Sequence, residues 1–252
     1  MLDIHNHCLF GIDDGAGTID EATRLLKVAE EDGVSSVILT PHYSVLDGFI
    51  ADYATVENLK KELEERLKED GINITLYTGN ELFIHDKLDQ MLDDKAVHTL
   101  AGSHYVLVEF PMDRYRDEYD EILYNMRISG YWIIIAHPER YAYVQKDPSF
   151  VCRWTDYGYY LQANTDSLKV VKKEKVIDYL IKRRILHFIA SDAHGVYRPA
   201  VLSGAYKCIT ANYSKEVADR LFKVNPEKII SNQRLDEMPE VKGKGIFDFL
   251  FR

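Results

Sequence analysis

The chain has 252 residues, of which 46% are hydrophobic and 12% aromatic, and a formal net charge of −10 at pH 7. This composition suits a folded domain with a substantial core, and the length fits one large α/β domain. The acidic balance argues against non-specific nucleic-acid binding, which needs a basic surface. No apolar run approaches the roughly 18 residues of a membrane span. With three scattered cysteines and no secretory pattern at the start, we expect a cytoplasmic protein without a disulfide framework.

Short apolar segments alternate with segments of helical period along most of the chain. Strands are predicted at 3–7, 36–40, 74–77, 105–108, 131–135 and 187–190. Apolar stripes predict helices from the capping box at 18–21 to Gly33, over 53–67, over 119–126 and over 170–181. Such alternation, with six or seven strands that are apolar throughout, is typical of a parallel sheet closed or nearly closed into a barrel.

No linker, internal repeat or low-complexity segment divides the sequence, so we expect one domain over residues 1–252. The alternation of predicted strands and helices ends after Asn225, and residues 225–252 are interpreted as a C-terminal extension. Its last part, 246–251, is strongly apolar. Two interpretations stay open for it: a terminal helix docked on the barrel, or a contact between subunits of a homo-oligomer.

Polar side chains follow the predicted strands with unusual regularity. They are, in chain order, His5 and His7, His42, Glu81, Glu109, His137 with Arg140, Gln162 with Asn164, and Asp192 with His194. In a β/α barrel these strand ends meet at one face, where active sites are built. Side chains at i and i+2 of an extended chain share a face, so His5 and His7 can reach one ion. Five histidines and at least three carboxylates at one face indicate a multinuclear site for Mn²⁺, Fe²⁺ or Zn²⁺.

Each of these residues taken alone has an ordinary explanation, such as a hydrogen-bonded boundary histidine or a solvated loop acid. The joint pattern argues for a metal site, because five strands supply ligand-type residues at the same end. The other histidines fit no strand end and are expected to have no part in it; they are His85, His98, His104 and His187.

Taken together, these motifs resemble the polymerase and histidinol phosphatase (PHP) superfamily. Within it, the chain is most similar to the bacterial tyrosine phosphatases of capsule and exopolysaccharide operons. The motifs that carry the resemblance are 3–7, 11–16, 40–42, 79–81, 137–140 and 191–194, and the similarity covers roughly residues 1–235. Many superfamily members have Thr-Asp-His where this chain has Thr40-Pro41-His42, and the proline favours the tyrosine phosphatase branch.

The resemblance implies a distorted TIM-like (β/α)7 barrel with three divalent ions, usually Mn²⁺, with Fe²⁺ and Zn²⁺ as alternatives. The ligands it implies are His5, His7, Asp14, His42, Glu81, Glu109, His137, Asp192 and His194. Which residue binds which ion cannot be derived from the sequence.

Such a site predicts hydrolysis of a phosphate monoester by a metal-activated hydroxide that attacks phosphorus in line. Arg140 and Arg198 are the candidates for binding the phosphoryl group, because a guanidinium matches its geometry. His42 or Asp192 is the candidate for proton transfer to the leaving phenolate.

A cysteine-based tyrosine phosphatase is excluded, since that chemistry needs an arginine six positions beyond the nucleophile. The residues at that distance from the three cysteines are an aspartate, a glycine and a serine. The sequence also contains no Walker-type glycine loop and no G-x-S-x-G elbow.

Three functions remain open. The first is dephosphorylation of a phosphotyrosine protein, with the tyrosine-rich tail of a polysaccharide-synthesis kinase as the partner that the resemblance implies. The second is hydrolysis of a small phosphate monoester such as histidinol phosphate. The third is a catalytically silent protein that binds a partner. None of them involves nucleic acid or insertion into a membrane.

Overall fold

The computed structural model describes residues 1–241. The apolar segment 246–251 lies outside the described residues. The strands are β1 (Leu2–Asp3), β2 (Ser36–Leu39), β3 (His42–Ser44), β4 (Phe49–Ile50), β5 (Thr75–Thr78), β6 (Glu81–Phe83), β7 (Tyr105–Glu109), β8 (Trp132–Ala136), β9 (Tyr160–Asn164) and β10 (Phe188–Ala190). The longer helices are α1 (Ile19–Glu31), α2 (Tyr53–Glu69), α4 (Glu118–Ile128), α7 (Val171–Lys182) and α8 (Ser203–Asn212).

Shorter helical segments complete the connections. They are α3 (Leu88–Asp93), η1 (Leu100–Gly102), η2 (Pro138–Arg140), α5 (Ala142–Lys146), η3 (Pro148–Val151), α6 (Cys152–Thr155), η4 (Asp166–Lys169), α9 (Lys215–Asp219), η5 (Arg220–Val224) and α10 (Asn225–Ile230). The fold is therefore a mixed α/β fold, as the alternation in the sequence predicted. In the part of the chain that the structure describes, no helix is both long and apolar enough to cross a membrane.

Within residues 1–241 the strands form two sheets, with orders β1-β2-β5 and β10-β9-β8-β7-β6-β3-β4. All pairs are parallel except the β3–β4 hairpin. The second sheet takes up where the first ends, because β2 runs on into β3 and β5 into β6. The break between β2 and β3 contains Pro41, which has no N–H to donate to a strand ladder. The break between β5 and β6 contains Gly79, where an added Cβ would lie 2.8 Å from the side chain of Leu100. The sequence pattern did not predict β3, β4 and β6 as separate strands.

Backbone contacts also join the free edges of the two sheets, β1 and β10. Asn6 forms an isolated parallel bridge with Ala193. On either side of it, the Asp192 amide donates to the His5 carbonyl at 2.9 Å and the His7 amide to the Ala193 carbonyl at 3.0 Å. The segments that follow these two strands therefore lie next to each other.

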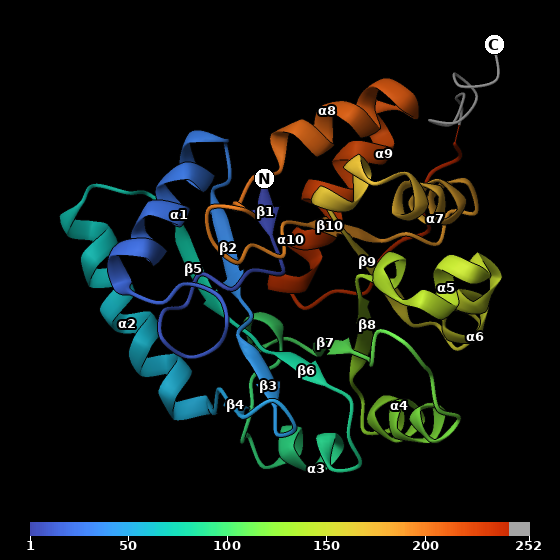
Figure 1. Cartoon of the computed structure of the whole chain (residues 1–252), viewed down its shortest axis with the longest axis horizontal. Coiled ribbons are helices and arrows are strands. Elements are labelled where there is room, and N and C mark those ends of the chain that lie inside the picture. Colours follow the sequence, from blue (N-terminus) through green and yellow to red (C-terminus); the bar gives the residue numbers. More distant parts are fainter. Residues whose placement is uncertain (242–252) are drawn as a thin grey trace.

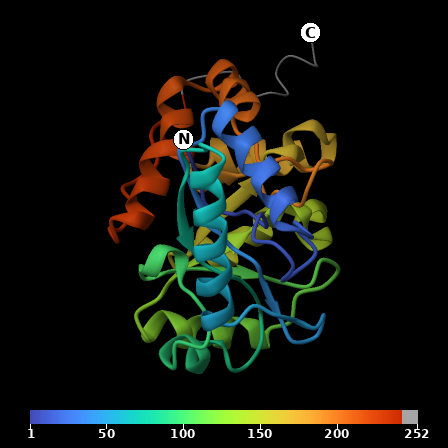
Figure 2. The same ribbon diagram turned by 90° about the vertical axis from the view of Figure 1, so that its left-hand side faces the viewer.

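The helices surround the strands (Figures 1 and 2). α1 and α2 pack against each other on one side, and the side chain of Thr18 caps α1 by accepting from the Glu21 amide. Buried side chains alternate along the strands between two apolar clusters. Val106 and Val108 of β7 belong to the cluster that faces the helices, whereas Tyr105 and Leu107 belong to a second cluster between the strands. This period of two is expected of strands buried on both faces.

Residues beyond Asn225 pack into the fold as well. Ile229 of α10 is fully buried in the cluster between the strands, and Leu235 packs against it. The buried side chain of Asn225 donates to the carbonyl of His187 at 2.8 Å, just before β10. This part of the predicted C-terminal extension therefore covers the strand ends opposite to the polar residues described next.

Candidate metal centre

All nine residues that the resemblance implied as ligands lie together at the carboxyl ends of the strands. In the described residues, three groups have ligand atoms within 4.8 Å of one another: His5, His7, Glu81 and Asp192; His7, Asp14, His42 and His194; and His42, Glu81 and Glu109. The ninth, His137, joins through its Nε2, which is 2.9 Å from Glu81 Oε1 and 3.4 Å from Glu109 Oε1.

His5 and His7 provide the centre of the cluster. They follow β1 in the extended segment that bridges to β10, and both side chains are fully buried. As the i, i+2 spacing predicted, the rings turn to the same side, with their Nε2 atoms 3.2 Å apart. Glu81 reaches the same point from β6, and Asp192 reaches it from the turn after β10.

A chain of amide side chains determines which nitrogen of His5 carries the proton. The Asp192 carboxylate can only accept, so Asn164 must present its Nδ2 to Asp192 Oδ2, at 2.5 Å. The Oδ1 of Asn164 then accepts from Gln162 Nε2 at 2.8 Å. This leaves Gln162 Oε1 facing His5 Nδ1 at 2.9 Å, so Nδ1 donates and Nε2 keeps a lone pair. The sequence analysis placed both amides at a strand end but assigned them no role.

His7 is oriented in the same way by Asp13. Its Nδ1 is 2.8 Å from Asp13 Oδ2, so Nδ1 donates and Nε2 again carries a lone pair. Asp13 also accepts from the backbone amides of Gly15 and His42. Its oxygens are thus occupied within the protein, whereas the side chain of Asp14 is half exposed and faces the histidines. The two adjacent aspartates could not be assigned these different roles from sequence alone.

The resulting arrangement of acceptors fits a divalent cation. Glu81 Oε2 lies 3.1 Å from His5 Nε2 and 3.2 Å from His7 Nε2, and Asp192 Oδ1 lies 3.4 Å from each. Both oxygens are buried and have no hydrogen-bond partner among the described residues. Two imidazole Nε2 atoms and two buried carboxylate oxygens thus converge at one point, which is costly for buried groups unless a positive charge offsets the carboxylates.

A second group of ligand-type side chains lies nearer to the solvent. Asp14 Oδ1 is 3.4 Å from His194 Nε2 and 3.6 Å from His42 Nε2. The hydrogen bond with His194 lowers the pKa of Asp14 to about 2. His194 donates from Nδ1 to the Asp192 carbonyl at 2.8 Å, which directs its Nε2 toward Asp14.

The third group surrounds Glu109 at the end of β7. His42 Nδ1 lies 3.1 Å from Glu81 Oε2 and 3.8 Å from Glu109 Oε2. Burial, and then the charge of Glu81, raises the pKa of the Glu109 carboxyl well above its usual value. An accumulation of buried carboxylates of this kind is typical of sites in which cations offset the negative charge.

Asp192 links this cluster to two arginines. Its Oδ2 accepts from Arg140 at 3.0 Å and from Arg198 at 2.7 Å, in addition to Asn164, while its Oδ1 faces the histidines. The structure thus brings the two arginines predicted to bind phosphate to the edge of the cluster. Both also line a cavity, which is described next.

This cavity lies directly over the ligand cluster. Its volume is about 510 Å³, and its wall combines Asp14, His42, Glu109 and His194 with the aromatic rings of Phe49, Phe83 and Phe110. The ring of Phe49 is stacked on that of His42, with 5.7 Å between the centroids. The cavity therefore has a charged floor and apolar side walls.

The backbone is strained at two of the cluster residues. His137, which follows β8, has φ +32°, and Asp192, which follows β10, has φ +51°. Non-glycine residues in this left-handed region cost free energy, and such strain is concentrated at functional sites.

Glu139 is fully buried beside these two residues and accepts from the Asn164 amide at 2.9 Å, and its burial raises its pKa to about 7.

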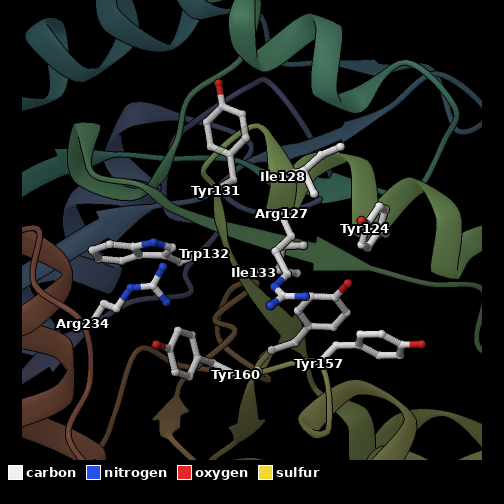
Figure 3. A pocket seen from close by; sticks show the side chains of 11 residues that line it. Tyr124, Arg127, Ile128, Tyr131, Trp132, Ile133, Tyr157, Tyr160 and Arg234 are labelled. Carbon is white, nitrogen blue, oxygen red and sulfur yellow. The ribbon is translucent and has the colours of Figure 1, made fainter.

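Other groups lie apart from the cluster. Burial raises the pKa of the Cys8 thiol, so it stays protonated. A separate pocket of about 440 Å³ is lined by Arg127, Trp132, Tyr160 and Arg234 among others (Figure 3). Trp132 and Tyr160 begin β8 and β9, at the strand ends opposite to the cluster, whereas Arg127 belongs to α4 and Arg234 follows α10. The residues that line this pocket include no metal-ligand group.

Comparisons with known proteins agree with this arrangement. The family model described as "Capsular polysaccharide synthesis, CpsB/CapC" matches residues 1–231. The tyrosine-protein phosphatase YwqE of Bacillus subtilis is 29% identical over 256 residues, covering 99% of this chain and all of the relative. A solved structure described as YwqE from Bacillus subtilis and CpsB from Streptococcus pneumoniae, "unique metal-dependent tyrosine phosphatases", superposes with a TM-score of 0.88 at 27% identity, covering 97% of this chain and 100% of that one.

A more distant structural likeness concerns the fold alone. The phosphotriesterase from Mycobacterium tuberculosis superposes with a TM-score of 0.55 at 8% identity, covering 85% of each chain.

The loop that carries both aspartates gives the first prediction. A Cβ added at Gly15 would lie 2.0 Å from the carbonyl oxygen of His7, whereas one at Gly17 would lie no closer than 3.7 Å to any neighbour. We expect Gly15→Ala to displace the loop from His7 and to reduce the divalent metal bound per chain, and Gly17→Ala to bind as the unmodified protein does. Elemental analysis after dialysis measures this, and equal metal content in the two variants would contradict it.

The amide chain gives the second prediction. Gln162→Leu removes the acceptor that orients His5 while keeping an apolar side chain of similar size. We expect divalent metal affinity to fall roughly 10- to 100-fold, as for other losses of groups that orient a ligand. Metal titration by calorimetry measures the affinity, and circular dichroism of the metal-free protein checks that the variant folds. A folded variant with unchanged affinity would show that the amides do not orient His5.

Proposed function

The chain belongs to the CpsB/CapC family of capsular polysaccharide synthesis, and we propose that it is a metal-dependent phosphatase that hydrolyses phosphotyrosine in proteins. The observation that carries this proposal is the convergence of the Nε2 atoms of His5 and His7 on Glu81 and Asp192, next to two arginines. The names of its relatives support the same activity, since YwqE and CpsB are tyrosine-protein phosphatases.

The fold proposed for this activity is the distorted (β/α)7 barrel expected from the sequence. β2 with β3 and β5 with β6 then count as single bent strands, and the Asn6–Ala193 bridge closes the ring between β1 and β10. The apolar cluster between the strands supports this, because it draws side chains from β1, β2, β7, β8 and β10.

We propose that the three ligand groups hold three divalent ions, with Mn²⁺ as the preferred metal. Nine side chains suffice if some carboxylates bridge neighbouring ions and waters complete each shell, and Glu81 takes part in two of the groups. Mixed imidazole and carboxylate ligands suit Mn²⁺, Fe²⁺ and Zn²⁺ alike, so the preference for Mn²⁺ comes from the family resemblance. When bound, such ions supply a nucleophilic hydroxide at neutral pH and offset the charge of the phosphoryl oxygens.

The residues of the chain then orient the substrate. Arg140 and Arg198 line the cavity beside Asp192, where their guanidinium groups can hold phosphoryl oxygens by charge-assisted hydrogen bonds. The rings of Phe49 and Phe83 form an apolar wall for the phenyl group of phosphotyrosine. His42, at the solvent side of the cluster, is placed to pass a proton to the leaving phenolate, with Asp192 as the alternative.

The substrate protein proposed from the family is a tyrosine kinase of polysaccharide synthesis with a tyrosine-rich tail. The family description, which refers to capsular polysaccharide synthesis, supports this context. Because Cys8, Cys152 and Cys208 are unpaired, a reducing compartment such as the cytoplasm suits the protein.

The activity is tested by phosphate release from a phosphotyrosine peptide, a phosphoserine peptide and histidinol phosphate. We expect release from phosphotyrosine with Mn²⁺, none after chelation, and no inhibition by thiol alkylation, because the site contains no reactive thiolate. Faster release from histidinol phosphate would instead assign the chain to small-molecule hydrolysis. Absence of release from any substrate would favour the partner-binding protein.

The arginines are tested by Arg198→Ala with Arg153→Ala as the matched control. Arg153 pairs with Asp117 and Asp120 near the surface and does not line the cavity. A hydrogen bond to a charged group contributes about 1.5–3 kcal/mol, so we expect kcat/KM for phosphotyrosine to fall about 10- to 100-fold in Arg198→Ala alone. Equal activity of the two variants would exclude Arg198 from phosphoryl binding.

A further inference from the structure

Two loop tips beside the cavity expose large apolar side chains. The first is the turn of the β3–β4 hairpin, which carries Val45 and Leu46; the second follows His194 and carries Val196 and Tyr197. Leu46 is 83% exposed and Tyr197 is completely exposed, more than any other large hydrophobic side chain of the described residues. We call these four residues the apolar rim.

Both tips are held by hydrogen bonds of their own. In the hairpin, Ser44 Oγ donates to Asp47 Oδ2 at 2.5 Å, across the turn. In the second loop, the Arg198 amide donates to the Gly195 carbonyl at 3.1 Å, and the His194 amide donates to the Arg198 carbonyl at 3.0 Å. The apolar side chains are thus presented by defined turns.

The apolar rim borders the cavity directly. Asp47 and Phe49, which flank the first tip, line the cavity, and so do His194 and Arg198, which flank the second. A cavity of about 510 Å³ has room for the side chain of a phosphotyrosine, whereas the polypeptide that carries it must cross the mouth. That polypeptide would therefore meet the rim.

Negative charge at the mouth of the cavity limits which residues can lie next to the phosphotyrosine of a bound polypeptide. Asp14 and Asp47 line the cavity at its solvent side, and the four rim residues carry no charge. Apolar side chains next to the phosphotyrosine would bury surface against the rim, whereas acidic ones would meet the carboxylate of Asp47, which is not among the proposed metal ligands.

We propose that the apolar rim binds the residues that flank the phosphotyrosine of the substrate protein and selects apolar over acidic neighbours. This inference rests on the proposed phosphotyrosine hydrolysis at the adjacent metal centre. It assigns Leu46 and Tyr197 to recognition of the polypeptide and leaves the phosphoryl group to the cavity.

The test uses the full-length, metal-loaded double variant Leu46→Ser/Tyr197→Ser. Its substrates are free phosphotyrosine and two phosphotyrosine peptides of equal length, one with leucine and the other with glutamate on both sides. The matched control is Ile128→Ser/Tyr157→Ser, which changes an exposed aliphatic residue and an exposed tyrosine at the pocket in Figure 3.

We expect the unmodified protein to prefer the leucine peptide. The rim variant should show kcat/KM for that peptide lowered roughly fivefold or more, mainly through KM, with free phosphotyrosine hydrolysed as before. The control variant should hydrolyse all three substrates like the unmodified protein.

Three results would overturn the inference: a rim variant with unchanged kcat/KM for the leucine peptide, an equal loss on free phosphotyrosine, or a loss confined to the control variant, which would move polypeptide binding to the pocket in Figure 3. These results differ from failure of the proposed function, in which the unmodified protein would release no phosphate even from free phosphotyrosine.

Discussion

The site depends on one electrostatic constraint, which is that buried imidazole nitrogens and carboxylate oxygens are packed against one another at one point. The Nε2 atoms of His5 and His7 are 3.2 Å apart, and Glu81 Oε2 is within 3.2 Å of both. Such a group of atoms would separate or take up protons if the surrounding residues allowed it. The Asp13 carboxylate and the amide oxygen of Gln162 accept the Nδ1 protons of the two rings, so both Nε2 atoms are held toward the carboxylates. The protein thus keeps this arrangement of buried polar groups at a cost in stability.

The same constraint explains why the strands end as they do. A regular ladder would continue past Leu39 and Thr78 and would direct alternate side chains away from the centre. The breaks at Pro41 and Gly79 restart the strands so that His42 and Glu81 begin β3 and β6 side by side, paired in register. At the other strand ends, left-handed backbone at His137 and Asp192 turns ligand-type side chains inward. The irregular parts of the fold are thus the parts that build the site.

The sequence was sufficient to predict the positions of ligand-type residues that directly follow a strand. The His5-x-His7 pair, the histidine after β8 and the Asp192-x-His194 pair were placed correctly at one face, because period two and strand-helix alternation determine where such side chains point. It could not separate Asp13 from Asp14, since adjacent identical residues differ only in what the loop turns them toward. It also could not give Gln162 and Asn164 their function, which depends on hydrogen bonds to residues more than 25 positions away. Whether nine residues act as ligands stays a prediction.

In the proposed function, Asp192 would join metal binding and substrate binding in one side chain. Its Oδ1 faces the histidines, and its Oδ2 accepts from Arg140 and Arg198, in each case through Nη1. A guanidinium has five N–H donors, so these contacts leave each arginine other donors for a phosphoryl group in the cavity. In the proposed function, this one carboxylate would position both the ion and the two arginines, so the distance between metal and phosphate would follow from the turn after β10. Strain at that turn, where Asp192 has φ +51°, is then the free-energy cost of fixing the histidine cluster and the two arginines relative to each other.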